Sequence, residues 1–130
     1  MLIADENISE EEIWRLREAG IPVRLIADVA AKSITDENVF PVLHSLKQPT
    51  FFSKDKDFWK HRLVHADYCL VCLDIPEHEG KVAAYMRRFL AQPDFNTKNK
   101  RMGKVVRVHV RGMEFYVKHM RKPHPVAWST

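Results

Sequence analysis

Short apolar runs alternate along this chain with stretches in which apolar residues recur at helical spacing. The short runs predict buried strands, at residues 1–4, 21–27, 49–53 and 68–73. Between them, apolar residues recur every three or four positions, as at Ile13, Leu16 and Ala19, which is the spacing of one helix face. Strands that alternate with helices in this way indicate an α/β fold with a central, mainly parallel sheet.

The first expected helix has recognisable ends. Ser9, followed three residues later by Glu12, predicts a capping box at its start, and Gly20 is a typical stop. A helix between two strands predicts a βαβ unit with a right-handed parallel crossover.

A second helix is expected after Thr35, which can act as its N-cap. Asp36 and Glu37 would lie in its first turn, where the helix dipole favours negative charge. Pro41 lies about a turn and a half further on, so the sequence predicts a kinked or delayed helix that continues to Leu46.

The C-terminal part of the chain ends in a different pattern. A helix is expected over residues 77–92, where apolar side chains form one stripe. After a polar loop, valines alternate with polar residues over 106–110, Arg111 and Gly112 allow a tight turn, and the alternation resumes at 115–117. This pattern predicts a β-hairpin with a basic outer face.

Length and composition indicate a single domain. The chain has 130 residues, 45% of them hydrophobic, which is enough for one buried core. We expect the α/β core over about residues 1–92 and a basic hairpin and tail over about 93–130. No apolar stretch approaches the roughly 20 residues that span a bilayer, and no basic region precedes the first apolar run, so a soluble, cytoplasmic protein is expected.

The two cysteines are expected to be inert. Cys69 and Cys72 lie within one apolar run that predicts a strand. Residues three apart on a strand point to opposite faces, which suits neither a disulfide nor a pair of zinc ligands. Two buried core thiols are the simplest interpretation.

Charge is distributed unevenly along the chain. The whole chain carries +4, but residues 96–130 hold nine Lys and Arg against one acid, so this segment carries about +8 and the rest about −4. Nucleic acid or an acidic protein surface would suit such a segment, although basic residues on an outer strand also deter sheet association. The candidate nucleic-acid contacts are Lys98, Lys100, Arg101, Lys104, Arg107 and Arg111, together with Lys54 and Lys56.

Acidic residues occur at three comparable places in the predicted fold. They are Asp5-Glu6-Asn7 after the first strand, Asp36-Glu37 at the start of the second helix, and Ser53-Lys54-Asp55-Lys56-Asp57-Phe58 after the third strand. The carboxyl ends of parallel strands meet at one end of a sheet, where ligands bind. Carboxylates gathered there indicate Mg²⁺ or Mn²⁺ and attack on phosphate esters. The alternative is that each acid has only a local role: Asp36 supplies helix-terminal charge, Asp55 and Asp57 shape a turn, and Asp5 caps the end of its strand.

Two further signals are weaker. His61 and His65 are four residues apart on an expected helix, which would place both on one face, and a solvated or partly packed pair is the favoured interpretation. Trp14, Trp59 and Trp128 could stack on bases, but core or subunit packing is favoured for the first two, and the third lies in the tail.

The three acidic motifs, in this order, resemble the small PIN-domain-like proteins, a family similar to the VapC-type toxin nucleases. The resemblance covers about residues 1–91, while Pro41 and the basic hairpin from Lys104 to Met120 depart from the family pattern. It implies a three-layer α/β fold with a parallel sheet, a divalent-metal site and ribonuclease activity on single-stranded RNA. By position, Asp5 matches the acid after the first strand, Asp36 or Glu37 the helix acid, and Asp55 and Asp57 the last pair.

The leading hypothesis is therefore a Mg²⁺- or Mn²⁺-dependent ribonuclease. Its catalytic residues would be Asp5, Asp36, Asp55 and Asp57, and its metal ligands would be drawn from these four together with Glu6 and Glu37. As the toxin of a toxin–antitoxin pair, this ribonuclease would be held inactive by a small antitoxin protein, and a homodimer is expected. The alternative is a non-catalytic module on a PIN-like scaffold that binds nucleic acid or protein.

Overall fold

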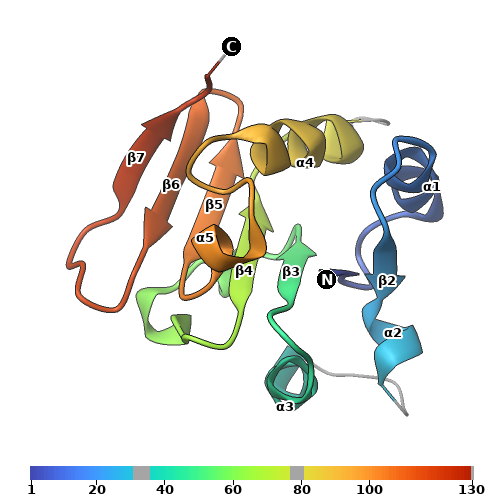
Figure 1. The fold of residues 1–130 in the computed structure, drawn as a ribbon, viewed down its shortest axis with the longest axis horizontal. Helices are drawn as coiled ribbons and strands as arrows, with labels where there is room; N and C mark the ends of the chain where they lie inside the picture. Colours follow the sequence, from blue (N-terminus) through green and yellow to red (C-terminus); the bar gives the residue numbers. More distant parts are fainter. Residues whose placement is uncertain (31–35, 77–80, 130) are drawn as a thin grey trace.

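The computed structural model describes residues 1–30, 36–76 and 81–129, with the side chains of Asp36 and Glu37 outside the description. Its described strands form one sheet of seven, in the order β2-β1-β3-β4-β5-β6-β7 (Figure 1). The strands are β1 Leu2–Ala4, β2 Val23–Leu25, β3 Thr50–Ser53, β4 Cys69–Leu73, β5 Val105–His109, β6 Gly112–Tyr116 and β7 His124–Ala127. The first five pair in parallel and the last two are antiparallel, which confirms the predicted α/β fold and C-terminal hairpin.

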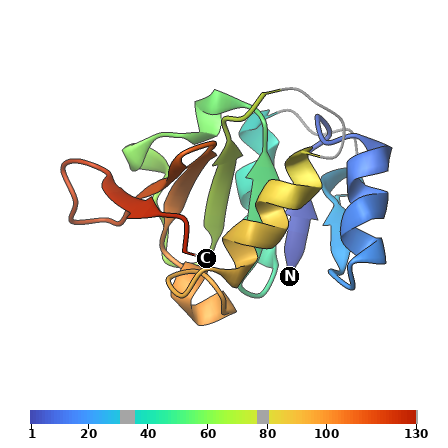
Figure 2. The same ribbon diagram turned by 90° about the horizontal axis from the view of Figure 1, so that it is seen from above.

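Helices cover both faces of the sheet (Figure 2). They are α1 Glu10–Glu18, α2 Ile26–Val29, α3 Asp36–Ser45, α4 Lys81–Ala91 and α5 Lys98–Arg101, with short 3₁₀ turns η1 Lys56–Phe58 and η2 His61–Leu63. Buried side chains of α1 and α4 pack on one face, and those of α2 and α3 pack on the other.

Each central strand contributes side chains to both cores. In β3, Phe52 packs on the side of α1 and α4, and Phe51 packs on the side of α3. Both phenyl rings are fully buried. Burial on two faces explains why these strands are continuous apolar runs and lack a polar alternation.

The start of α1 agrees with its sequence signal only in part. Ser9 is the N-cap, and its Oγ accepts the N–H of Glu12 at 3.3 Å. The Glu12 carboxylate is buried, and its Oε2 accepts the N–H of Ala83 at 3.1 Å in the first turn of α4. The start of a helix carries free N–H groups and partial positive charge. The Glu12 carboxylate therefore accepts one of the free N–H groups of α4 and links α1 to α4.

The two crossovers on the face of α1 and α4 have opposite hands. The connection through α1 leads from β1 to β2, and the connection through α4 leads from β4 to β5. The helices pack on the same face, but these connections run in opposite directions along the strand order. Only one of them can therefore follow the right-handed rule that the sequence analysis assumed for βαβ units.

One strand prediction needs correction, and one strand was not predicted. The apolar run 21–27 forms a strand only from Val23 to Leu25, because Ile26 begins α2. A further strand, β7, pairs with β6 and was not expected. It carries Pro125, which an outer strand tolerates. Its close approach leaves Val126 O only 2.6 Å from where a Cβ at Gly112 would lie, so Gly112 is needed there.

Among the helices of the described residues, none combines the length and the hydropathy that a membrane crossing requires.

Candidate functional site

The strand order has its switch point between β1 and β3. These two strands are neighbours, and the chain leaves β1 towards β2 on one side and β3 towards β4 on the other. Ligands of open α/β sheets bind in the crevice that forms outside the carboxyl ends of strands at such a switch point. Asp5 directly follows β1, and Ser53 is the last residue of β3.

Asp5 is held firmly at this position. Its side chain is largely buried, with 8% of the residue exposed. Oδ1 accepts the N–H of Glu6 at 2.8 Å, and Oδ2 accepts the hydroxyl of Ser53 at 2.7 Å and Nδ2 of Asn7 at 3.3 Å. A buried carboxylate is costly unless it is hydrogen-bonded, and these three donors meet that requirement.

Ser53 links the loops that follow the two strands. Its fully buried hydroxyl donates to Asp5 and accepts from Asn7 Nδ2 at 2.9 Å and from the N–H of Asp55 at 3.0 Å. Asn7 Oδ1 accepts the N–H of Lys54 at 3.2 Å. Ser53 and Asn7 both lie within the motifs that carry the acids, but the sequence pattern alone assigned neither of them a role.

Asp55 and Asp57 lie in the turn that begins η1. Asp55 is its N-cap, and Oδ1 accepts the N–H of Asp57 at 2.9 Å. The Asp57 side chain is 77% exposed and lies 3.9 Å from Lys60 Nζ. The turn-shaping role that the sequence left open is therefore present, and it occupies one of the two Asp55 oxygens.

The remaining predicted acids are Asp36 and Glu37 at the start of α3 and Glu6 after β1. Asp36 is the first residue of α3, and its side chain and that of Glu37 lie outside the described residues. The helix runs continuously through Pro41 to Ser45, so it is not delayed by the proline. Glu6 is exposed and lines a pocket with Asp5.

The donor atoms at the switch point fit a hard cation in type. Mg²⁺ and Mn²⁺ take oxygen ligands and keep several waters, and Asp5 and Asp55 offer carboxylate oxygens on loops joined through Ser53. The only three metal-ligating side chains whose ligand atoms lie within 4.8 Å of one another, among those described, are His44, His65 and Asp67. The described carboxylates are thus not assembled as a closed set of three.

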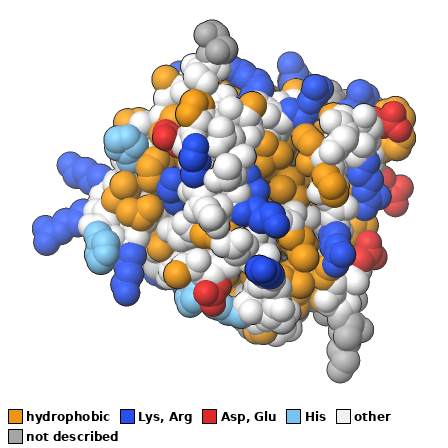
Figure 3. Space-filling view, viewed as in Figure 1, with side chains coloured by type: hydrophobic (Ala, Val, Ile, Leu, Met, Phe, Trp, Pro, Cys, Tyr) orange, Lys and Arg blue, Asp and Glu red, His pale blue; other side chains and the backbone are white. Residues whose placement is uncertain are grey.

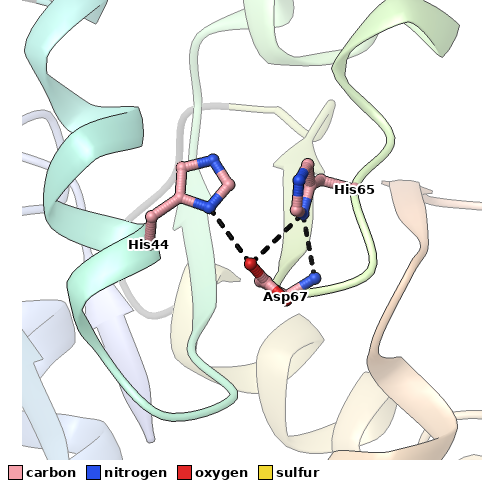
Figure 4. Close-up of side chains that lie close together, drawn as sticks. All are labelled: His44, His65 and Asp67. Atoms are coloured by element: carbon pink, nitrogen blue, oxygen red, sulfur yellow. Dashed lines mark hydrogen bonds and ion pairs between the residues drawn. The ribbon is translucent and has the colours of Figure 1, made fainter.

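His44, His65 and Asp67 form a separate exposed cluster (Figure 4). Asp67 Oδ2 lies 3.3 Å from His44 Nδ1 and 3.7 Å from His65 Nδ1, and the His65 ring stacks on Tyr68. The cluster precedes β3 and β4 in the chain, so it lies at the amino end of the sheet, opposite Asp5. Exposed pairs of this kind are common as surface contacts.

The expected pair of histidines on one helix face is wrong. Residues 61–63 form only one 3₁₀ turn, so four-residue spacing no longer places His61 beside His65. His61 Nε2 lies 3.2 Å from the carbonyl oxygen of Val117, whereas His65 packs against His44.

A charged network that the sequence analysis missed lies after β4. Asp74 Oδ2 accepts a hydrogen bond from Arg107 Nε at 2.9 Å and forms an ion pair with the same guanidinium at 2.8 Å, and Arg107 also donates to Glu114 at 2.7 Å. Lys56 Nζ lies 3.3 Å from Asp74 Oδ1. Partial burial opposes ionisation of Asp74, but the hydrogen bonds from Arg107 and Lys56 outweigh it and hold the pKa of Asp74 below its usual value. Two predicted nucleic-acid contacts, Lys56 and Arg107, are thus paired within the protein.

Several of the basic residues lie away from Asp5. Lys104 directly precedes β5, and α5 lies beside the first residue of β3, so both are at the amino end of the sheet. Arg101 is only 6% exposed, and its guanidinium donates to Thr50 Oγ1 and to the carbonyl oxygen of Phe95, both at 2.9 Å. This buried side chain supports the core and presents no surface to a nucleic acid.

Three predicted nucleic-acid contacts and a further basic loop lie on the surface. Lys98 and Lys100 are exposed on α5, although Lys100 Nζ is 2.9 Å from the carbonyl oxygen of Pro93. Arg111 is exposed in the turn between β5 and β6. Basic side chains also project from the loop between β6 and β7, at the left of Figure 3; they include Lys118, Arg121 and Lys122.

The cysteines behave as predicted, whereas Trp14 is not packed in the core and its packing against a second subunit stays a prediction. Cys69 and Cys72 are buried and unpaired, and burial raises the pKa of each thiol to about 12. Trp14, for which packing was favoured, is 56% exposed on α1. Trp59 packs on Tyr116, with ring centroids 4.8 Å apart.

Comparisons of the chain with protein-family models, with curated proteins and with solved structures found no match.

Proposed function

We propose that this protein is a Mg²⁺- or Mn²⁺-dependent, PIN-like ribonuclease that cleaves single-stranded RNA. The observation that supports this function most directly is the joining of Asp5 and Asp55 through the Ser53 hydroxyl at the switch point. The topology and the acidic motifs favour the same position for a ligand.

Asp5 and Asp55 are the residues that would hold the ion. Oδ1 of Asp5 accepts one hydrogen bond and retains a lone pair, and Oδ2 of Asp55 is not used by the turn. Ser53 and Asn7 fix the Asp5 carboxylate so that its free lone pair keeps one direction. A bound Mg²⁺ or Mn²⁺ would supply charge neutralisation at phosphate and a more acidic water.

Other groups complete the proposed site. Asp36 or Glu37 would supply the helix carboxylate that the family resemblance implies, and Asp57 would orient water from the exposed side of the η1 turn. The ammonium group of Lys56 would bind a phosphate oxygen on leaving Asp74, from which it is 3.3 Å away on an exposed side chain. A small inhibitory protein and a second copy of the chain are the partners that we propose.

A non-catalytic RNA-binding module is the second candidate. The observation that favours it is that the carboxylates of Asp5 and Asp55 already accept hydrogen bonds from other groups of the protein. In this case the carboxylates would organise loops, and RNA binding would depend on basic side chains and on salt concentration.

Cleavage of an end-labelled single-stranded RNA with Mn²⁺ would test the nuclease proposal. The variants are Asp5→Asn, which keeps the shape and one acceptor oxygen, and Asp94→Asn, which changes a carboxylate on an exposed loop near α5. We expect the wild type and Asp94→Asn to cleave, and Asp5→Asn to lose at least about a hundredfold in rate. Circular dichroism would verify that both variants are folded.

Metal binding gives a second readout that does not depend on cleavage. Ligand binding to the native state raises the melting temperature, so saturating Mn²⁺ should stabilise the wild type and not Asp5→Asn. Equal cleavage by all three proteins, or cleavage by none, would refute the nuclease. RNA binding that persists in Asp5→Asn without any cleavage by the wild type would support the second candidate.

A further inference from the structure

An exposed tryptophan lies beside the switch point. Trp14 is on the outer surface of α1 and is the most exposed large hydrophobic side chain among the described residues. It lines a pocket of about 600 Å³ that also contains Asp5 and Glu6. The indole and the Asp5 carboxylate therefore belong to the walls of one hollow.

The walls of this pocket combine an apolar interior with a few polar groups. Ile8, Ile13 and Leu25 supply aliphatic surface, and Glu6 and Glu10 supply carboxylates. These residues lie at the carboxyl ends of β1 and β2, or in the loop and helix start that follow β1. An apolar pocket with few acceptors suits a flat aromatic ligand whose edge carries N–H groups.

The acidic rim excludes one part of a nucleotide and suits another. Three carboxylates line the same pocket, and its one guanidinium, that of Arg17, already donates to the carbonyl oxygen of Val23. The pocket therefore repels a phosphate group that is not accompanied by a cation. A nucleobase has no charge, can stack on an indole, and can donate its amino or imino hydrogens to a carboxylate.

Trp14 also lines a second hollow. It measures about 470 Å³, lies between α1 and α4, and is lined by Trp14 and Arg87, among others. Arg87 is exposed on α4. A strand with one base on Trp14 can thus direct a neighbouring phosphate towards this guanidinium.

We infer that Trp14 is the stacking platform of a nucleobase subsite, which positions one unpaired base of a single-stranded RNA beside Asp5. The subsite deepens the proposed nuclease function and rests on it for the identity of the ligand. A base within a duplex is stacked on its neighbours and cannot enter, so the subsite selects single strands. Arg87 binds a phosphate of the adjacent nucleotide.

Fluorescence of Trp14 tests this inference without any cleavage. The variant Trp59→Phe/Trp128→Phe leaves Trp14 as the single tryptophan, and EDTA removes divalent ions. An adenylate RNA of about ten nucleotides should quench the emission saturably. An abasic strand of equal length and charge should bind more weakly and quench little.

Binding of the same RNA to variants of the otherwise wild-type chain locates the contact. Trp14→Ala should weaken binding by about tenfold to a hundredfold, while Trp14→Tyr should retain most of it. Val110→Ala is the matched control, because Val110 is an exposed hydrophobic residue in a different part of the fold. Arg87→Gln should weaken binding, and the slope of the logarithm of the binding constant against the logarithm of salt concentration should fall by the amount expected for about one phosphate contact.

Three outcomes would overturn the inference. The first is that RNA binds but leaves the emission of Trp14 unchanged, and that Trp14→Ala binds RNA as tightly as the wild type. The second is that the protein does not bind RNA. The third is that the emission shifts to the blue as the protein concentration rises in the absence of RNA, which would show that a second copy covers the indole. The proposed nuclease can fail separately: stacking on Trp14 without cleavage refutes only the nuclease, and cleavage that is indifferent to Trp14→Ala refutes only the subsite.

Discussion

Replacement of Ser53 by alanine removes only one hydroxyl group but should destabilise the protein strongly. The hydroxyl is fully buried and takes part in three hydrogen bonds, with the Asp5 carboxylate, the Asn7 amide and the Asp55 N–H. A hydrogen bond to a charged group contributes about 2 kcal/mol and one to a backbone N–H about 1 kcal/mol, whereas the exposed Asn7 amide can turn to water. The expected loss of unfolding free energy for Ser53→Ala is therefore about 3 kcal/mol.

Urea unfolding followed by circular dichroism would measure this loss. With an m-value of about 1.5 kcal/mol per molar urea, the midpoint should fall by about 2 M. Ser45→Ala is the matched control, because its exposed hydroxyl makes a single 2.6 Å bond to the carbonyl oxygen of Val42 in α3. Water replaces that bond, so the control should change stability by less than about 0.5 kcal/mol.

The comparison of the two serine variants can refute the reasoning. If Ser53→Ala loses no more stability than Ser45→Ala, the Ser53 hydroxyl does not organise the switch point. If Ser53→Ala is destabilised but keeps the full Mn²⁺-induced rise in melting temperature, the hydroxyl stabilises the loops and does not orient a metal ligand.

Three further predictions concern other parts of the fold. Arg101→Met should lower the unfolding free energy by about 2 kcal/mol in urea melts, because it leaves buried acceptors unpaired, while Lys100→Met should have little effect. Asp74 has a lowered pKa in the folded state, so the stability that its ion pair with Arg107 contributes is fully present above the unfolded pKa. That contribution is lost as the pH falls through the folded pKa. The difference in unfolding free energy between the wild type and Asp74→Asn should therefore shrink below about pH 4 in acid titrations. Neither cysteine of the native protein should react with a thiol reagent at about pH 8, since both thiols are buried with a pKa of about 12, and rapid labelling without denaturant would contradict their burial.

Local sequence patterns were sufficient to predict the main sheet and the position of Asp5. Side-chain periodicity reports burial, and burial on both faces distinguishes the central strands from the helices. Parallel pairing then places all carboxyl ends together, so a residue directly after β1 must lie near one that ends β3. The 2.7 Å contact between Asp5 and Ser53 is the physical consequence of that rule.

The charged partners could not be predicted in the same way. Arg107 meets Asp74 and Glu114 because of the register in which β5 pairs with β4 and β6. Arg101 reaches Thr50 across a gap of 51 residues. A count of basic residues contains no information about register or burial, so it cannot separate a buried guanidinium from an exposed one.

The arrangement of charge therefore changes what an RNA contact requires. The lysines of α5 and Lys104 lie at the amino end of the sheet, and Asp5 lies at the carboxyl end. One extended strand could reach both ends only by passing over the side of the molecule. The surface adjacent to Asp5 is instead formed by α1, with Trp14, and by the loop that carries Lys54 and Lys56. Arg111, in the turn after β5, lies at the same end of the sheet as Asp5. An RNA bound for cleavage would thus depend on stacking and on a few nearby cations more than on Lys104 and the lysines of α5, whose charge is then available to a different acidic partner.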